Sequence, residues 1–315
     1  MTKRMRNKIL RLALTVVSLI WVVNIVGFDE IVNTLIKSNY VFAILALLLF
    51  QLSLFIRTFR WKLLLTDDED SPDFLTLLKL NYIGSFFDVF LLSGFGGDIV
   101  RVVESREQLK QKSLSDHTSV IIMDRYSGFL ALFSIAVLAI PFAIGIIPTQ
   151  MLIWTALFAV AGLLSPILIV SGLGNRLIAR LADKFPRLSS ASAFVGNISE
   201  IARTKLLKSW LTSLVFHFVI ILTHFTLNLS IGANIDLIAF TIFTPIVAMT
   251  LLMPSIQGLG LRESTYAFLF AQVGAPEALG ASLGLLIFGV KVFTGLLGGA
   301  VYLVYSLTKD QSQSA

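Results

Sequence analysis

The chain has 315 residues, of which 56% are hydrophobic and 14% are charged. A soluble domain is roughly 45–50% apolar and about 25% charged, so the composition excludes an ordinary soluble protein and indicates an integral membrane protein. The sequence contains no cysteine, which excludes a disulfide framework, a thiol nucleophile and a thiolate metal site. The net charge of +6 fits lysine and arginine at membrane borders better than it fits nucleic-acid binding.

Six apolar runs are each long enough to cross about 30 Å of hydrocarbon as a helix. They cover residues 9–28, 40–64, 119–140, 151–170, 210–231 and 279–307. We therefore expect an all-α polytopic membrane protein with about six full transmembrane helices, built as one membrane domain over residues 1–308 with a short polar tail at 309–315. The first run follows a basic stretch but lacks a small-residue cleavage site, so we expect it to be retained as a helix.

A first broken motif is expected over residues 74–101. Residues 74–95 are long enough to span, but they hold Lys79, Asn81 and Asp88 and become rich in glycine toward their end. If they crossed the bilayer, the next two spans would place the basic loop at 172–208 outside, against the preference of lysine and arginine for the cytoplasm. We therefore expect residues 74–95 to enter from the cytoplasm and return to it, with a polar helix at 98–112 on the cytoplasmic surface.

A second broken motif lies between residues 235 and 273, where two apolar pieces flank a segment with proline and glycine. A re-entrant hairpin from outside and two separate crossings both return the chain to the same side of the membrane, so the sequence allows either. In the hairpin interpretation, the two broken motifs enter from opposite faces and form an inverted repeat that meets near the midplane. Irregular backbone is tolerated in a membrane only where protein or a wet cavity covers it, and such paired interruptions point to a transport site.

Four motifs along the chain form a recognisable combination. They are Arg57-Thr58-Phe59-Arg60-Trp61, Gly97-Asp98-Ile99-Val100-Arg101, Asp124-Arg125-Tyr126-Ser127-Gly128, and the segment from Pro254 to Glu263 with its Gly-x-Arg-Glu end. Together they resemble the lysylphosphatidylglycerol synthase transmembrane (flippase-like) family, from the second span to the last. The sequence departs from the family pattern at Ser93-Gly94, where a proline is usual, and at Asp124, where glutamate is usual.

The resemblance implies a role in moving lipids between leaflets of a prokaryotic cytoplasmic (inner) membrane, with both termini in the cytoplasm. Synthases of the family carry a soluble aminoacyltransferase domain after the membrane part. This sequence ends at Ala315 directly after its last helix, so aminoacyl transfer is not expected. The implied partners are membrane lipids, either an anionic or aminoacylated phospholipid or a polyprenyl phosphate. A soluble synthase or glycosyltransferase and a homo-oligomer are further options, and no nucleic acid is expected.

The candidate residues for binding a lipid headgroup are Arg101, Arg125, Arg262 and Lys291. An arginine fork suits bidentate contact with phosphate, and a helix that starts after a break exposes N–H groups to an anion. The candidate supporting groups are Asp98, Asp124, Glu263 and Gln257, and the candidate hinge positions are Gly94, Gly96, Gly97, Pro254, Gly258 and Gly260. The alternative is structural: the same charges cap the hairpins, and Asp124 pairs with Arg125 at the cytoplasmic mouth.

Two helix faces carry further patterns. At 100° per residue, one narrow stripe on the last helix holds Gly280, Gly284, Lys291, Gly295 and Gly298. The glycines allow close helix packing, and a lysine on that face must point into protein or a cavity, with Asp88 as a candidate structural partner. A second stripe holds Ser213, His217, His224 and Asn228, for which interhelical hydrogen bonding is favoured over a proton relay.

The first functional hypothesis is a lipid transporter that binds the headgroup in an arginine-lined polar cavity. No Gly-x-Ser-x-Gly, Walker or zinc motif occurs, so no enzyme activity, cofactor or metal is expected, and movement would be passive or ion-coupled. The second hypothesis is a membrane enzyme or enzyme subunit of lipid or glycolipid modification, with Asp98, Asp124 and Glu263 as acid–base groups. The third is a module that recruits a soluble synthase through the basic loop.

Overall fold

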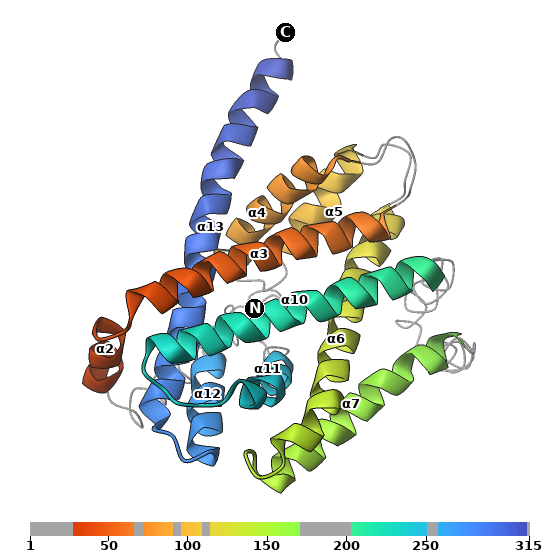
Figure 1. Ribbon diagram of the computed structural model, residues 1–315. Coiled ribbons are helices and arrows are strands. Elements are labelled where there is room, and N and C mark those ends of the chain that lie inside the picture. Colours follow the sequence, from red (N-terminus) through yellow and green to blue (C-terminus); the bar gives the residue numbers. More distant parts are fainter. Residues whose placement is uncertain are drawn as a thin grey trace, which may run out of the picture.

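The computed structural model describes residues 28–65, 72–90, 96–108, 114–170, 203–250 and 258–313. In these ranges the chain is helical and contains no strand (Figure 1). The helices are α2 (Phe28–Ile36), α3 (Tyr40–Leu64), α4 (Phe74–Phe90), α5 (Gly96–Gln108), α6 (Leu114–Ala143), α7 (Thr149–Val170), α10 (Arg203–Ser230), α11 (Leu237–Thr250), α12 (Leu261–Gln272) and α13 (Glu277–Gln313). All but the last residue of the expected first span at 9–28, and most of the basic loop at 172–208, lie outside the described residues.

Four of the described helices are long and apolar enough to cross a membrane. Their spanning parts are Tyr40–Leu64, Thr118–Ala143, Thr204–Ser230 and Glu277–Tyr305. These correspond to four of the six expected spans, and α7 supplies a shorter apolar stretch, Thr149–Ser165, at the position of a fifth. The chain is therefore an all-α, multi-pass membrane protein, as its composition predicts.

The first broken motif forms a helical hairpin. α4 has 17 residues, which is shorter than the roughly 20 that a full crossing needs. α5 folds back along it, and the two helices approach so closely that a Cβ on Gly84 would lie 3.2 Å from the carbonyl oxygen of Gly97. The later residue Asp88 also reaches Gly97, and Gly84 lies beside Arg101, so the two helices run antiparallel.

The second broken motif also consists of two short helices. α11 has 14 residues and α12 has 12, and the hydroxyl of Thr265 in α12 donates a hydrogen bond of 3.3 Å to that of Thr250 in α11. The chain enters α12 through Gly258 and Gly260, whose φ angles are 74° and 80°. Side chains other than glycine rarely adopt such angles, so both positions require glycine for the turn. Glu263 then accepts the backbone N–H of Gly260 at 2.6 Å, which caps the start of α12.

The last helix, α13, holds both hairpins through its glycines. A Cβ on Gly284 would lie 2.8 Å from the Cα of Glu263 in α12, and one on Gly298 would overlap the carbonyl oxygen of Tyr82 in α4. Later residues of α13 contact earlier residues of each partner, so α12 and α4 both run antiparallel to it. α4 and α5 accordingly lie toward the C-terminal end of α13, and α12 lies toward its other end (Figure 1).

The two hairpins therefore approach the middle of α13 from opposite ends. The final turn of α4 lies near Gly295, where Val89 is 3.1 Å from the position of a Cβ, and the first turn of α12 lies at Gly284. At 1.5 Å per residue these two glycines are about 16 Å apart along the helix. Lys291 lies between them, so it occupies the place where the broken ends of the two hairpins converge.

Candidate functional site

Asp124 of α6 is the centre of a buried charge network. Its Oδ1 accepts a hydrogen bond of 2.6 Å from Nε of Arg60 in α3, and its Oδ2 accepts two hydrogen bonds of 3.2 Å from Nη1 and Nη2 of Arg101 in α5. Asp124 and Arg101 are each only 1% exposed. A buried carboxylate is stable only when it is paired and hydrogen-bonded, and here two neighbouring helices, α3 and α5, supply the arginines that pair with it.

Asp98, in the first turn of α5, pairs with the more exposed part of the network. Its Oδ1 accepts hydrogen bonds of 3.4 Å from Nη2 of Arg57 and from Nη1 of Arg101. Its Oδ2 pairs with Nε of Arg125. The side chains of Arg57 and Arg125 are 21% and 39% exposed, whereas that of Arg101 is almost fully buried. The network therefore has a buried side around Asp124 and an accessible side around Asp98.

Aromatic and hydroxyl groups hold the buried arginines in place. The guanidinium of Arg101 lies 4.3 Å from the ring centroid of Trp61, and that of Arg60 lies 5.1 Å from the ring centroid of Phe216. Arg60 also donates a hydrogen bond of 3.0 Å to the hydroxyl of Ser213 in α10. Cation–π contacts of this kind are strongest where water is excluded, so they fix these two side chains as part of the framework.

A small cavity adjoins the accessible side of the network. It has a volume of about 130 Å³ and is lined from α3, α4 and α13, with Arg57, Asp88 and Lys291 as its charged groups. Asp88 is held by the backbone N–H of Gly97, which donates to its Oδ1 at 2.8 Å. Among the described residues, the network and this cavity together gather the five cations Arg57, Arg60, Arg101, Arg125 and Lys291 against the three carboxylates Asp88, Asp98 and Asp124. The excess positive charge suits an anionic ligand.

The second broken motif contributes a buried pair at the other side of Lys291. Nη1 of Arg262 lies 3.9 Å from Oε1 of Glu263, and both side chains are at most 1% exposed. Lys291 interacts electrostatically with Arg262 and Glu263 as well as with Arg57 and Asp88. Lys291 thus interacts electrostatically with charged groups of both broken motifs.

The structure places the sequence-predicted residues as follows. Asp98, Arg101, Asp124 and Arg125 come together in the network, Arg262 and Glu263 form the pair at the start of α12, and Lys291 lies between the two groups. Gly96 and Gly97 begin α5, and Gly258 and Gly260 lead into α12. Gly94, Pro254 and Gln257 lie outside the described residues.

The expected pairing of Asp124 with Arg125 is not the one observed. Asp124 pairs with Arg60 and Arg101, and Arg125 pairs with Asp98. Consecutive residues of a helix point in different directions, so neighbours in the sequence do not face each other. Asp124 points into the bundle, while Arg125 points toward α5 and remains partly exposed.

From the sequence, Arg57, Arg60 and Trp61 were recognised only as part of a family motif and were not counted as site residues. The structure places Arg57 and Arg60 in the network and Trp61 beneath Arg101. A signal was available, because a spacing of three places the two arginines on the same face of a helix. The partner of that face, α5, could be identified only from the fold.

In the polar stripe on α10, Ser213 and His224 form the interhelical hydrogen bonds favoured from the sequence, whereas the bonds of His217 and Asn228 are local. His224 shares a hydrogen bond of 2.9 Å with the hydroxyl of Tyr266 in α12, and His217 one of 3.0 Å with the carbonyl oxygen of Ser213. Asn228 donates to the carbonyl oxygen of Ala233 at 3.0 Å, which ties down the turn after α10. The described residues contain no group of three or more acidic, histidine or cysteine side chains that could hold a metal ion.

These features define a multi-pass helical membrane protein with two broken hairpins around a buried cluster of arginines. The chain belongs to the family described as the lysylphosphatidylglycerol synthase TM region, whose model matches residues 8–299. It is also similar to a UPF0104 membrane protein of Pyrococcus horikoshii, with 23% identity over 290 residues that cover 82% of this chain and 85% of the relative. No solved structure matches the chain.

Proposed function

We propose that this protein moves a lipid with an anionic headgroup between the two leaflets, and that the headgroup binds in the polar site between the two broken hairpins. The observation that carries the proposal is the excess of cations around the cavity of Arg57, Asp88 and Lys291, at the point where α4 and α12 converge on α13. Membership of the lysylphosphatidylglycerol synthase TM region family supports a function that concerns lipids.

The size of the cavity favours one anionic group as the part that is bound. Its volume of about 130 Å³ compares with about 30 Å³ per molecule in liquid water and with roughly 300–1,000 Å³ for a typical ligand pocket. A phosphate or a carboxylate fits this space, whereas a whole sugar or aminoacyl headgroup does not. The rest of the headgroup would extend toward the exposed side of Arg125, and the hydrocarbon chains would stay in the bilayer.

The arginines of the network differ in exposure, and we assign them different roles on that basis. Arg60 and Arg101 are nearly inaccessible and form the framework with Asp124. Arg57, Arg125 and Lys291 are the cations that a headgroup can reach, and Asp98 holds the two arginines when no lipid is bound. A phosphate that enters the cavity would replace Asp98 as their partner, at little cost because charge-assisted hydrogen bonds are exchanged for similar ones.

The proposed location is a prokaryotic cytoplasmic membrane with both chain termini on the cytoplasmic side. An even number of full crossings returns the chain to the side on which it started. The basic residues of the 172–208 region favour the cytoplasm for that side. The relative from Pyrococcus horikoshii is consistent with a prokaryotic source.

The experiment that tests the proposal compares lipids that differ only in headgroup charge. Purified protein would be placed in liposomes that contain a chain-labelled fluorescent phospholipid with an anionic, a zwitterionic or a cationic headgroup, and leaflet exchange would be followed by quenching from outside. The proposal expects anionic lipid to exchange at least tenfold faster than cationic lipid. Equal exchange of all three, or no exchange by folded protein, contradicts it. In the second case, product formed from labelled lipid would favour a lipid-modifying enzyme.

A further inference from the structure

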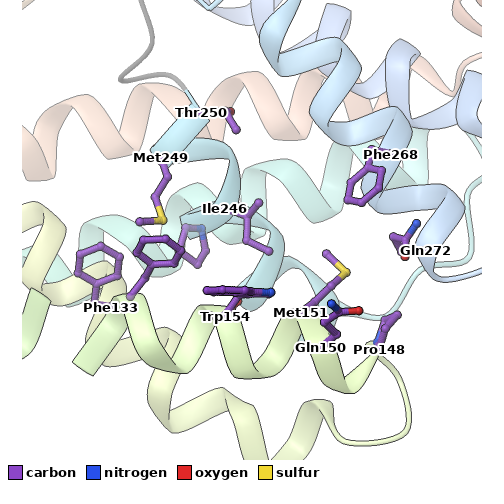
Figure 2. A pocket seen from close by; sticks show the side chains of 13 residues that line it. Phe133, Pro148, Gln150, Met151, Trp154, Ile246, Met249, Thr250, Phe268 and Gln272 are labelled. Carbon is purple, nitrogen blue, oxygen red and sulfur yellow. The ribbon is translucent and has the colours of Figure 1, made fainter. Parts of the chain in front are cut away.

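A wide apolar groove lies on a different part of the molecule from the arginine network. It has a volume of about 720 Å³, within the range of ligand-binding pockets, and it lies between α6, α7, α11 and α12 (Figure 2). Its walls are mainly apolar and include Phe133, Met151, Trp154, Ile246, Met249 and Phe268. The small charged cavity is lined from α3, α4 and α13, so the two sites share no helix.

The polarity of the groove changes from one end to the other. Gln150, in the first turn of α7, and Gln272, the last residue of α12, lie with Pro148 at one end (Figure 2). Both glutamines adjoin turns between helices, Gln150 the turn from α6 to α7 and Gln272 the turn from α12 to α13. Met249 and Phe133 lie at the other end (Figure 2), and the lining also includes the hydroxyl groups of Thr155 and Thr250.

The groove is open at the surface of the helices that line it. Its lining residues Trp154 and Phe268 are 56% and 52% exposed. The medium at an exposed apolar surface of a membrane domain is lipid chain, and an apolar channel with a polar end has the same polarity profile as one lipid chain with its ester linkage. Each glutamine amide can donate two hydrogen bonds and accept others, which suits ester or hydroxyl oxygens at the head of a chain.

We propose that the groove binds one hydrocarbon chain of a membrane lipid along α7 and α11, with Gln150 and Gln272 hydrogen-bonded to the polar group at the head of that chain. The lipid held here is a second one, separate from the lipid at the arginine network, and the proposal does not depend on transport. The groove also reaches Thr250, the last residue of α11. The hydroxyl of Thr250 accepts a hydrogen bond from that of Thr265 in α12. A bound chain therefore packs against both helices of the second hairpin and stabilises it.

The first test measures lipid retained by protein purified in mild detergent, with native mass spectrometry as the readout. The wild-type protein is expected to retain one lipid. The groove-filling variant Met151→Trp/Met249→Trp is expected to lose it. Leu157→Trp serves as the control, because Leu157 is exposed on the same helix as Met151 and does not line the groove. Retention of the lipid by the filled variant, or an equal loss from the control, overturns the proposal.

The second test does not depend on the folding of the filled variant. Because the chain has no cysteine, Met249→Cys and Leu157→Cys each provide a single thiol without adding bulk to the groove. In protein extracted into mild detergent, a bound lipid chain is expected to slow the reaction of a small thiol reagent at position 249 until the lipid is removed, and to leave the reaction at position 157 unchanged. If a segment of this chain covers the groove, position 249 reacts slowly with or without lipid, and the proposal is wrong.

Discussion

Oδ2 of Asp124 accepts hydrogen bonds from both terminal nitrogens of Arg101, each at 3.2 Å, and the two side chains are almost completely buried. This contact joins α6 to α5, the returning helix of the first hairpin. Arg60 joins the same carboxylate from α3. The first broken motif is therefore fixed by charge to two helices that are long enough to span the membrane.

Replacing Asp124 with asparagine is expected to destabilise the protein strongly. The substitution leaves Arg60 and Arg101 buried without a shared carboxylate, and breaking a buried ion pair in this way costs about 3–5 kcal/mol. The free energy of unfolding in detergent measures the effect. Asp236→Asn is the control, because Asp236 is exposed and precedes α11, where asparagine caps a helix as well as aspartate does. Equal stability of the two variants would show that the network does not hold the fold.

The close contact between α13 and α4 predicts opposite effects for two glycine substitutions on one helix. A Cβ at Gly298 would overlap the carbonyl oxygen of Tyr82, whereas a Cβ at Gly289 has nothing within 4 Å. Gly298→Ala should therefore lower the free energy of unfolding by about 1–3 kcal/mol. Gly289→Ala should raise it by up to about 1 kcal/mol, because alanine favours the helix. A tolerated Gly298→Ala would mean that α4 does not pack against α13 as described.

The start of α4 predicts a pH-dependent contribution to stability. Asp73 accepts the backbone N–H of Thr76 at 3.1 Å, and hydrogen bonding from Thr76 holds the pKa of the Asp73 carboxyl below its ordinary value. A carboxyl whose pKa is lowered by folding stabilises the folded state above its unfolded pKa of about 3.9, and loses this effect as the pH falls through the folded value. Asp73→Ala should cost about 0.5–2 kcal/mol at neutral pH and less in acid.

The control for this prediction is Asp73→Asn, which keeps a hydrogen-bond acceptor but removes the titration. Its stability relative to the alanine variant should stay constant between pH 7 and acid, while that of the wild type declines. A constant difference between the wild type and Asp73→Ala over the same range would rule out the ionised cap.

The sequence predicted the fold class and several spans because long apolar runs have few alternatives to membrane helices. It also predicted that residues 74–95 do not form a simple crossing. A crossing there would place the basic loop outside, and the segment contains the polar residues Lys79, Asn81 and Asp88. The structure gives α4 and α5 as a hairpin at this position. What periodicity could not supply was the order in which helices pack, which depends on contacts between residues far apart in the chain.

The sequence identified several charged residues of the candidate site, but not which of them form ion pairs with each other. Asp98, Arg101, Asp124 and Arg125 were identified as charged residues near breaks or within helices, since such residues are costly in a membrane. Their partners were not identified, because Arg60 lies 64 residues from Asp124 in the sequence. The glycine stripe around Lys291 was more informative, since only a helix face in close contact needs several glycines. The structure uses that face for both α12 and α4.

The central claim is that cations around the small cavity bind the headgroup that is moved, and Lys291 tests it most directly. Exchange of a fluorescent anionic phospholipid would be measured in liposomes with the wild type, with Lys291→Gln and with Lys62→Gln, an exposed lysine on α3 that does not line the cavity. The account predicts that Lys291→Gln slows exchange at least tenfold while the protein stays folded and Lys62→Gln matches the wild type. Unchanged exchange by folded Lys291→Gln would contradict it.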